Sequence, residues 1–216
     1  MTDRIIKTGK DIRDGVKTLS AKCPNMQRIH KLVGDPPLRR RPAGFPGLAR
    51  IIVGQQLSVA SAGAIWSRIE QTVDPLTADR LLALDDEALR EAGLSRAKVR
   101  TLRALSTAVA EQGFNLSRLG RATNHTIHER LTAIHGIGPW TADIFIMFCL
   151  GRADGWAPGD LALQYGVQAA FDLDEKPKLV EMYEISERWR PWRGVAARLL
   201  WSYYGALREG RASVPL

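Results

Sequence analysis

Cysteine is scarce in this sequence, with only Cys23 and Cys149 among 216 residues. A disulfide framework or a four-cysteine metal or iron–sulfur site needs more sulfur ligands than these two. The four histidines include one His-x-x-His pair, His125 with His128, but no cluster of acids or cysteines accompanies it. We therefore expect two free thiols and no metal centre built from side chains.

Long apolar runs are also missing. No stretch approaches the roughly 18 uncharged apolar residues of a membrane helix, and the start of the chain, Met1–Gly15, lacks the apolar core of a signal peptide. Hydrophobic residues make up 45% of the chain, enough for a substantial core in one or two domains. We expect a globular cytoplasmic protein that is not attached to a membrane.

Positive charge is concentrated at the front of the chain. The net charge is +8, and residues 1–43 hold 11 basic and four acidic side chains, whereas residues 153–216 hold eight and nine. Such an excess favours polyanionic partners. Arg39, Arg40 and Arg41 lie next to prolines and glycines, and this run is either a solvated linker or an arm that contacts phosphate.

Helical periodicity runs through most of the sequence, and no segment alternates with period two over a convincing strand length. We therefore predict an all-α protein of about ten helices. Ser58 and Ser95 are placed as N-caps of two of them. The helix after Ser58 is predicted to bury one stripe of apolar residues, namely Val59, Ala62, Ile65, Trp66, Ile69 and Val73.

The helix predicted after Ser95 begins with four basic residues, Arg96, Lys98, Arg100 and Arg103. Positive side chains near a helix N-terminus oppose the helix dipole. The cluster is therefore interpreted either as a phosphate contact or as a solvated helix face.

A glycine hairpin organises the second half of the chain. Gly136 and Gly138 permit positive φ and close backbone approach, and Pro139 suits the first turn of the helix that follows. Thr126 and Glu129 have capping-box spacing and predict the start of the preceding helix. Unpaired backbone amides at the hairpin would form an anion site that reads phosphate and not sequence.

The segment from Leu131 to Leu163 resembles the helix-hairpin-helix superfamily of DNA glycosylases. Within it, the chain is most similar to the AlkA-type DNA-3-methyladenine glycosylases. The matching motifs are Gly136–Ala142 (GIGPWTA), Pro158–Leu161 (PGDL), Ile52–Ser58 (IVGQQLS), Gly93–Lys98 (GLSRAK) and Pro191–Arg193 (PWR).

This resemblance implies two helical subdomains with the active-site cleft between them. The central subdomain would be residues 44–152, containing the hairpin, and the second would combine residues 1–43 with 153–216. Fuller AlkA-type enzymes begin with a β-rich domain, and the sequence before Leu48 leaves no room for one.

The resemblance also implies a monofunctional DNA N-glycosylase of base excision repair that flips alkylated purines, such as 3-methyladenine and 7-methylguanine, out of the duplex. Asp160 would be the catalytic acid, stabilising the oxocarbenium ion of the sugar or orienting water. The same residue suits a helix N-cap. Asp143 and Asp154 are less favoured alternatives.

Further site residues follow by the same resemblance. Trp140 and Trp201 would line the base pocket, because aromatic faces suit a cationic base. Ile144 lies in the pocket wall, where some relatives carry an aromatic residue. Trp140 occupies the position of the lysine nucleophile of bifunctional relatives, so AP lyase activity is not expected.

The remaining contacts would be made to DNA. Gly136, Gly138 and Thr141 are predicted to contact the DNA backbone. Gln56, with Gln55 beside it, is predicted to form the wedge that fills the gap left by the flipped base.

No cofactor and no iron–sulfur cluster are expected. The resemblance suggests a structural Na⁺ or K⁺ held by the carbonyl oxygens of Thr132, Ile134 and Ile137. The expected partner is double-stranded DNA containing alkylated bases, bound by a monomer. Two alternatives stay open: a non-catalytic helix-hairpin-helix protein that binds damaged DNA, and a glycosylase for mismatched or oxidised bases.

Overall fold

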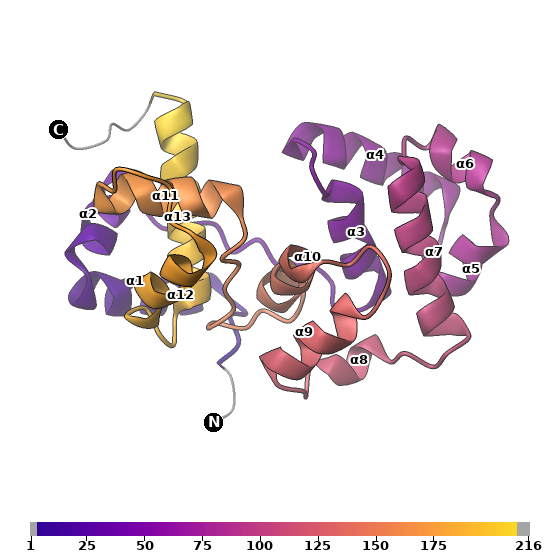
Figure 1. Ribbon diagram of the computed structural model, residues 1–216, viewed down its shortest axis with the longest axis horizontal. Coiled ribbons are helices and arrows are strands. Elements are labelled where there is room, and N and C mark those ends of the chain that lie inside the picture. Colours follow the sequence, from indigo (N-terminus) through magenta and orange to yellow (C-terminus); the bar gives the residue numbers. More distant parts are fainter. Residues whose placement is uncertain (1–3, 211–216) are drawn as a thin grey trace. The chain divides into compact units, whose positions relative to one another are not determined.

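The computed structural model describes residues 4–210, and this part of the chain is helical (Figure 1). It contains thirteen α-helices and one π-helix. Outside the helices, the described residues form only an isolated antiparallel bridge between Ile5 and Arg152. The all-α prediction is confirmed. The helices outnumber the ten expected because several are short, such as α8 (Leu116–Leu119).

No helix in the described range is long and apolar enough to cross a membrane.

The described chain forms two compact units. Residues 4–40 and 151–210 make up one, called here the terminal unit, and residues 41–150 make up the other, the central unit. The boundaries predicted from the sequence, at 44 and 152, lie three and two residues from these. We describe each unit separately.

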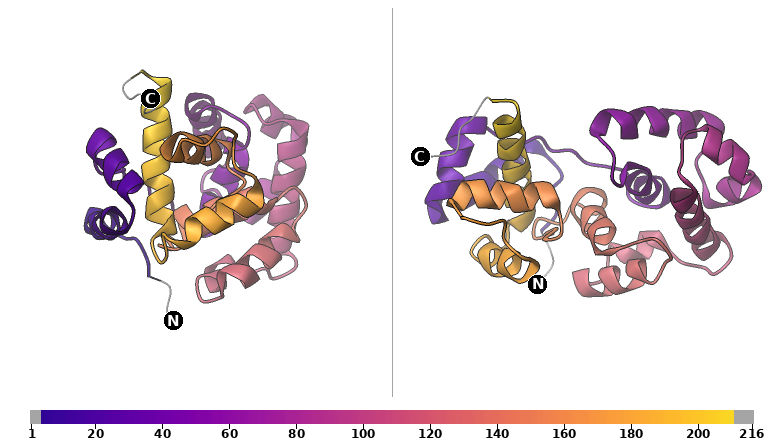
Figure 2. Two further views of the ribbon diagram at one scale, coloured as in Figure 1. Left: turned by 60° about the vertical axis from the view of Figure 1, so that its left-hand side comes forward. Right: turned by 45° about the horizontal axis from the view of Figure 1, so that its top comes forward.

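The terminal unit is built around its last helix. Its helices are α1 (Gly9–Lys22), α2 (Pro24–Val33), α11 (Leu161–Phe171), α12 (Leu179–Glu187) and α13 (Arg193–Arg208). Helix α13 packs against α1, α2 and α11 (Figures 1 and 2). Its side chains Val195, Leu199, Leu200 and Tyr203 are completely buried. A Cβ at Gly15 would lie 2.7 Å from Val195 Cγ2, so a glycine in α1 permits this close packing.

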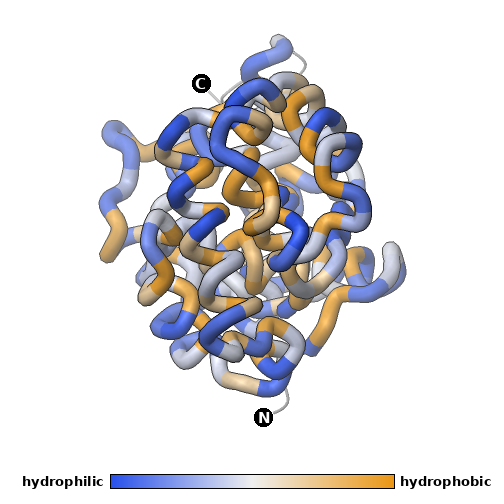
Figure 3. The backbone as a smooth tube through the Cα atoms, turned by 90° about the vertical axis from the view of Figure 1, so that its right-hand side faces the viewer, coloured by the Kyte–Doolittle hydropathy of each residue, from blue (hydrophilic) through white to orange (hydrophobic). Residues whose placement is uncertain are grey.

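The central unit holds the hairpin. Its helices are α3 (Phe45–Gly54), α4 (Val59–Thr72), α5 (Ala78–Ala83), α6 (Asp86–Glu91), α7 (Arg96–Ala110), α8, α9 (Asn124–Thr132), α10 (Pro139–Ile144) and the π-helix η1 (Phe145–Cys149). Helix α3 contacts α4, α7, α10 and η1. Hydrophobic and hydrophilic stretches are interspersed along the backbone (Figure 3), as in amphipathic helices that bury one face.

Local capping signals were predicted correctly at two helices. The Ser58 hydroxyl accepts a hydrogen bond from the Ser61 amide, and the Ser95 hydroxyl accepts one from Lys98. The predicted start at Thr126 is wrong, because Thr123 is the N-cap of α9 and accepts from the Thr126 amide.

The predicted apolar stripe of α4 is only partly buried. Trp66, Ile69 and Val73 belong to the core, but Val59 is 90% exposed. Val59 is the first residue of α4 and follows an exposed corner at Gln56–Ser58, so no neighbouring helix covers it. The prediction of a core role for Val59 is therefore wrong.

Candidate functional site

Asp160 and Trp201 are brought together in the terminal unit. Asp160 is the N-cap of α11, and its Oδ1 accepts a hydrogen bond from the Leu163 amide at 2.9 Å. The same oxygen accepts a hydrogen bond from Trp201 Nε1, on α13, at 2.9 Å. Both side chains are half-buried. The carboxylate is thus held in one orientation by two donors from two helices.

The loop before Asp160 is supported by buried polar contacts. Gln164 Nε2 donates to the carbonyl oxygen of Pro158 at 2.9 Å, and Lys176 Nζ donates to Gln164 Oε1 at 2.8 Å. These bonds anchor the Pro-Gly turn to α11. They therefore fix the position of the Asp160 backbone, which follows that turn.

Asp154, a less favoured candidate for the acid, has a structural role. Its carboxylate accepts hydrogen bonds from Arg193 Nε at 2.9 Å and Arg193 Nη2 at 2.8 Å, and also from Arg190. Arg193 is 8% exposed. A bidentate pair of this kind is strong and directional, and it ties the start of α13 to the loop. This contact accounts for the arginine of the Pro191–Arg193 motif.

The central unit contains the hairpin between α9 and α10. Gly136 has φ of +79°, and a Cβ there would lie 1.8 Å from Thr101 Oγ1 on α7. Gly138 has φ of −90°, and its added Cβ would meet nothing within 4 Å. Within residues 4–210, the amides of Gly136 and Gly138 donate to no protein acceptor. Two N–H groups therefore remain for a ligand such as phosphate.

Thr141 lies inside the protein and is 2% exposed. Its hydroxyl accepts a hydrogen bond from Gln55 Nε2 at 2.8 Å, and its amide donates to the carbonyl oxygen of Gly138 at 3.0 Å. The predicted contact of Thr141 with the DNA backbone stays a prediction. In the protein, the Thr141 side chain connects the start of α10 to Gln55.

The corner between α3 and α4 presents one glutamine outward and one inward. Gln56 is exposed and has φ of +55°, a left-handed conformation that is costly for a residue other than glycine. Gln55 is half-buried, and its side chain is bonded to Thr141. The two glutamines therefore differ in environment, although the sequence placed them together at the wedge.

Two further candidates for the pocket lie on α10. Trp140 is half-buried, whereas Ile144 is 5% exposed and belongs to the core of the central unit.

The basic cluster at the start of α7 is divided between internal and external roles. Lys98 Nζ donates to the carbonyl oxygen of Val53 at 2.7 Å, and burial lowers the pKa of Lys98 below its ordinary value. Arg103 Nη1 donates to the carbonyl oxygens of Leu81 and Leu82. Arg96 and Arg100 are exposed. Only part of the cluster thus faces solvent. The sequence predicts either a phosphate contact or a solvated face for the whole cluster, and neither describes the inward Lys98 and Arg103.

The arginine run is also anchored. Arg40 Nη1 donates to the carbonyl oxygen of Ile6 at 2.8 Å in the terminal unit. Arg41 belongs to the central unit, where its amide donates to the carbonyl oxygen of Phe148 at 3.0 Å. Arg39 is exposed and has φ of +44°. Burial, together with the charges of Arg40 and Arg39, lowers the pKa of Arg198 on α13 to about 10.

No group of three or more His, Cys, Asp or Glu that could hold a metal ion occurs in residues 4–210. Cys23 and Cys149 are buried and are not joined in a disulfide. The hairpin carbonyls offer oxygen ligands of the kind that hard cations prefer. The Ile134 carbonyl already accepts the Ile137 amide at 3.1 Å, but a carbonyl oxygen has two lone pairs. The hairpin therefore fits a monovalent cation in donor chemistry.

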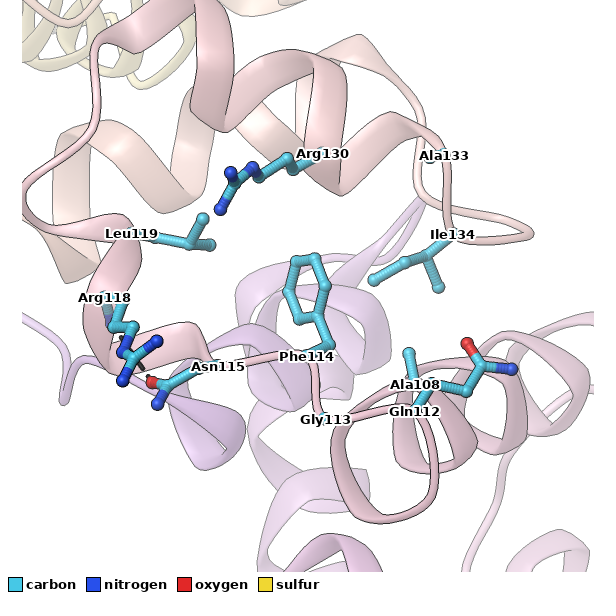
Figure 4. Close-up of a pocket in the computed structure, with 10 residues that line it drawn as sticks. All are labelled: Ala108, Gln112, Gly113, Phe114, Asn115, Arg118, Leu119, Arg130, Ala133 and Ile134. Carbon is cyan, nitrogen blue, oxygen red and sulfur yellow. Dashed lines mark hydrogen bonds between the residues drawn. The ribbon is translucent and has the colours of Figure 1, made fainter.

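A pocket of about 480 Å³ lies beside the hairpin in the central unit (Figure 4). Its floor contains buried apolar side chains, including Leu119 and Ile134, and Phe114 projects between its walls. Arg118 and Arg130 line it and are exposed. No motif in the sequence marks these lining residues, which come from separate helices and loops.

Comparison with known proteins gives one family and several relatives. The model of the HhH-GPD superfamily base excision DNA repair proteins matches residues 49–191. DNA-3-methyladenine glycosylase 1 of Schizosaccharomyces pombe is 30% identical over 190 residues, which cover 85% of this chain and 83% of that protein.

Two solved structures are similar along nearly their whole length. The S. pombe 3-methyladenine DNA glycosylase Mag1, solved in complex with abasic DNA, has a TM-score of 0.83 and 27% identity, covering 93% of this chain and 99% of that chain. The DNA-3-methyladenine glycosidase of Bacillus halodurans has a TM-score of 0.77 and 33% identity, covering 97% and 95%.

The matched region contains the Gln55–Gln56 corner, the glycine hairpin and Asp160, and it extends over most of the chain. The fold, the hairpin geometry and this match agree, and the chain belongs to the HhH-GPD superfamily of base excision DNA repair proteins.

Proposed function

We propose that this chain is a monofunctional DNA-3-methyladenine glycosylase that acts as a monomer on double-stranded DNA. It would excise alkylated purines such as 3-methyladenine and 7-methylguanine. Family membership and the names of the relatives support this proposal. The observation that carries it is the carboxylate of Asp160, oriented by Trp201 Nε1 and the Leu163 amide.

The proposed chemistry is hydrolysis of the bond between C1′ of deoxyribose and the base nitrogen. As this bond breaks, the electron pair leaves with the base and positive charge develops on the sugar. Asp160 stabilises this oxocarbenium ion or orients the attacking water. An alkylated base carries positive charge and leaves readily, so a second carboxylate acting as general acid is less necessary.

Recognition of the base is assigned to Trp140 and Trp201, with Ile144 in the wall that the base approaches. A cationic purine is attracted to aromatic faces more strongly than a neutral base. Trp140 has no amine that could form a Schiff base where bifunctional relatives carry lysine, so the reaction should stop at an abasic site.

Binding to DNA is assigned to the hairpin and the corner. The free amides of Gly136 and Gly138 would donate to a backbone phosphate. Gln56, exposed and conformationally strained, would enter the space left by the flipped nucleotide. The carbonyls of Thr132, Ile134 and Ile137 would hold Na⁺ or K⁺, whose charge would attract the same phosphate.

Methylated DNA tests the proposal directly. The chain is incubated with it, and the released bases are separated by chromatography. Release of 3-methyladenine and 7-methylguanine is expected, without strand cleavage. The Asp160→Asn variant should release neither base while binding DNA as the wild type does, and excision at the wild-type rate by this variant would remove Asp160 from the mechanism.

Two alternative functions predict different results in this assay. A non-catalytic damage-binding protein would bind an abasic-site analogue tightly and release no base. A glycosylase for mismatched or oxidised bases would leave methylated DNA intact and act on duplexes containing those lesions.

A further inference from the structure

Two segments of the central unit meet on one face of α7, the face that carries Lys98 and Thr101. They are the C-terminal end of α3 with the corner that follows it, and the hairpin. Lys98 and Thr101 are three residues apart in one helix, so their side chains lie on the same face. One rigid helix therefore contacts both of the segments to which DNA binding is assigned.

Lys98 holds the end of α3. Its Nζ donates to the carbonyl oxygen of Val53 at 2.7 Å, and Val53 precedes the last residue of α3. The last carbonyls of a helix have no partner within it, and a positive group there is favoured by the helix dipole. Lys98 thereby fixes the backbone two residues before Gln55 and three before Gln56.

Thr101 holds the hairpin. Its Oγ1 would lie only 1.8 Å from a Cβ at Gly136. The backbone of the hairpin therefore packs directly on α7. Thr101 is itself 4% exposed, and its hydroxyl donates to the carbonyl oxygen of Ala97 at 3.0 Å. The hairpin cannot move toward α7 without a steric clash.

Gln55 links the corner between α3 and α4 directly to the hairpin and the start of α10. Its Nε2 donates to Thr141 Oγ1 at 2.8 Å and approaches the carbonyl oxygen of Gly136 at 3.5 Å. The residues joined here are 86 apart in sequence. The corner is therefore bound to the hairpin directly through Gln55 and indirectly through Lys98 and α7.

We propose that Lys98 and Gln55 are positioning residues that set the distance between Gln56 and the phosphate-binding hairpin. This inference rests on the proposed function. A nucleotide flips only when the wedge enters the stack while the neighbouring backbone is held, so a fixed distance between wedge and hairpin couples binding to flipping. Loss of either residue leaves backbone binding intact and impairs flipping.

The variants are Lys98→Met and Gln55→Met, which keep the length of the side chain and remove its hydrogen bonds. Matched controls are Arg90→Met, an exposed cation of α6 outside the basic cluster of α7, and Gln71→Met, an exposed glutamine of α4. Flipping is followed by the fluorescence of 2-aminopurine placed in the duplex, binding by anisotropy, and base release by single-turnover kinetics. Thermal melting shows whether each variant is folded.

Lys98→Met and Gln55→Met should reduce 2-aminopurine unstacking and the single-turnover rate about tenfold, with the Kd for undamaged duplex changed less than about twofold. Both control variants should match the wild type. Lys98→Arg, which retains a donor for the Val53 carbonyl, should recover part of the loss.

Unaltered flipping and excision in both variants would overturn the inference. So would parallel losses of binding, flipping and melting temperature, because they would indicate a structural role only. A wild-type protein that unstacks 2-aminopurine but releases no alkylated base would refute the proposed function, while the comparison of flipping between variants would still decide the role of Lys98 and Gln55.

Discussion

Trp201 Nε1 donates a hydrogen bond to Asp160 Oδ1 at 2.9 Å, joining α13 to the N-cap of α11. A hydrogen bond to a carboxylate is stronger than one between neutral groups and fixes the orientation of the acceptor. Under the proposed function, Trp201 would therefore have two tasks: its ring would face the base, and its N–H orients the Asp160 carboxylate.

Trp201→Phe separates these tasks, because phenylalanine keeps an aromatic face and lacks the N–H donor. Losing a hydrogen bond to a charged group costs about 1.5–3 kcal/mol, so we expect the single-turnover rate of base release to fall by about tenfold or more. The Kd for undamaged DNA should not change. An unaltered rate would mean that the indole N–H does not position Asp160.

Gly136→Ala and Gly138→Ala form a matched pair within the hairpin. An alanine at position 136 would have positive φ and would clash with Thr101, whereas one at position 138 would meet no atom within 4 Å. We expect Gly136→Ala to lower the free energy of unfolding by about 2 kcal/mol or more, and Gly138→Ala to change it by less than about 0.5 kcal/mol. Urea denaturation measures both, and equal effects would contradict the close packing of the hairpin on α7.

Gln56→Gly tests whether backbone strain serves the wedge. Glycine adopts φ of +55° at little cost, so the free energy of unfolding should rise by about 0.5–1 kcal/mol. Glycine has no side chain to enter the DNA stack, and 2-aminopurine unstacking should fall. Greater stability with normal unstacking would show that the Gln56 side chain is not the wedge.

Asp11 should contribute to the pH dependence of stability. The Lys7 amide, the Thr8 hydroxyl and the Thr8 amide donate to its carboxylate and hold its pKa below the ordinary value of 3.8. Because the folded state binds the proton more weakly than the unfolded state, this stabilisation is present above the ordinary pKa and is lost as the pH falls through the lower, folded value.

Asp11→Asn keeps an acceptor oxygen but removes a negative charge from the first turn of α1, where solvent screens it. It should therefore lower stability by about 0.5 kcal/mol near neutral pH and should reduce the further loss on acidification. Melting temperature as a function of pH measures this. Glu91→Gln, at an exposed carboxylate, provides the control. If wild type and Asp11→Asn lost melting temperature identically on acidification, the hydrogen bonds from Lys7 and Thr8 to Asp11 would not be formed in solution.

The features that depend on neighbours in the chain could be predicted from the amino-acid sequence. Helical periodicity gave the all-α class, Ser58 and Ser95 gave two helix starts, and the motifs around Gly136–Gly138 and Asp160 gave the family. These signals are local, because capping and the conformational freedom of glycine act within one helical turn.

Which polar groups form hydrogen bonds with one another depends on the packing of the helices. Gln55 bonds to a residue 86 positions away, Trp201 to one 41 positions away, and Lys98 to a carbonyl 45 positions away. A side chain of a given type can face solvent, DNA or a helix end with the same local sequence, and packing selects among them. For this reason the sequence grouped Gln55 with Gln56 and Lys98 with its basic neighbours, whereas the fold turns Gln55 and Lys98 inward, where their hydrogen bonds join the corner, α7 and the hairpin.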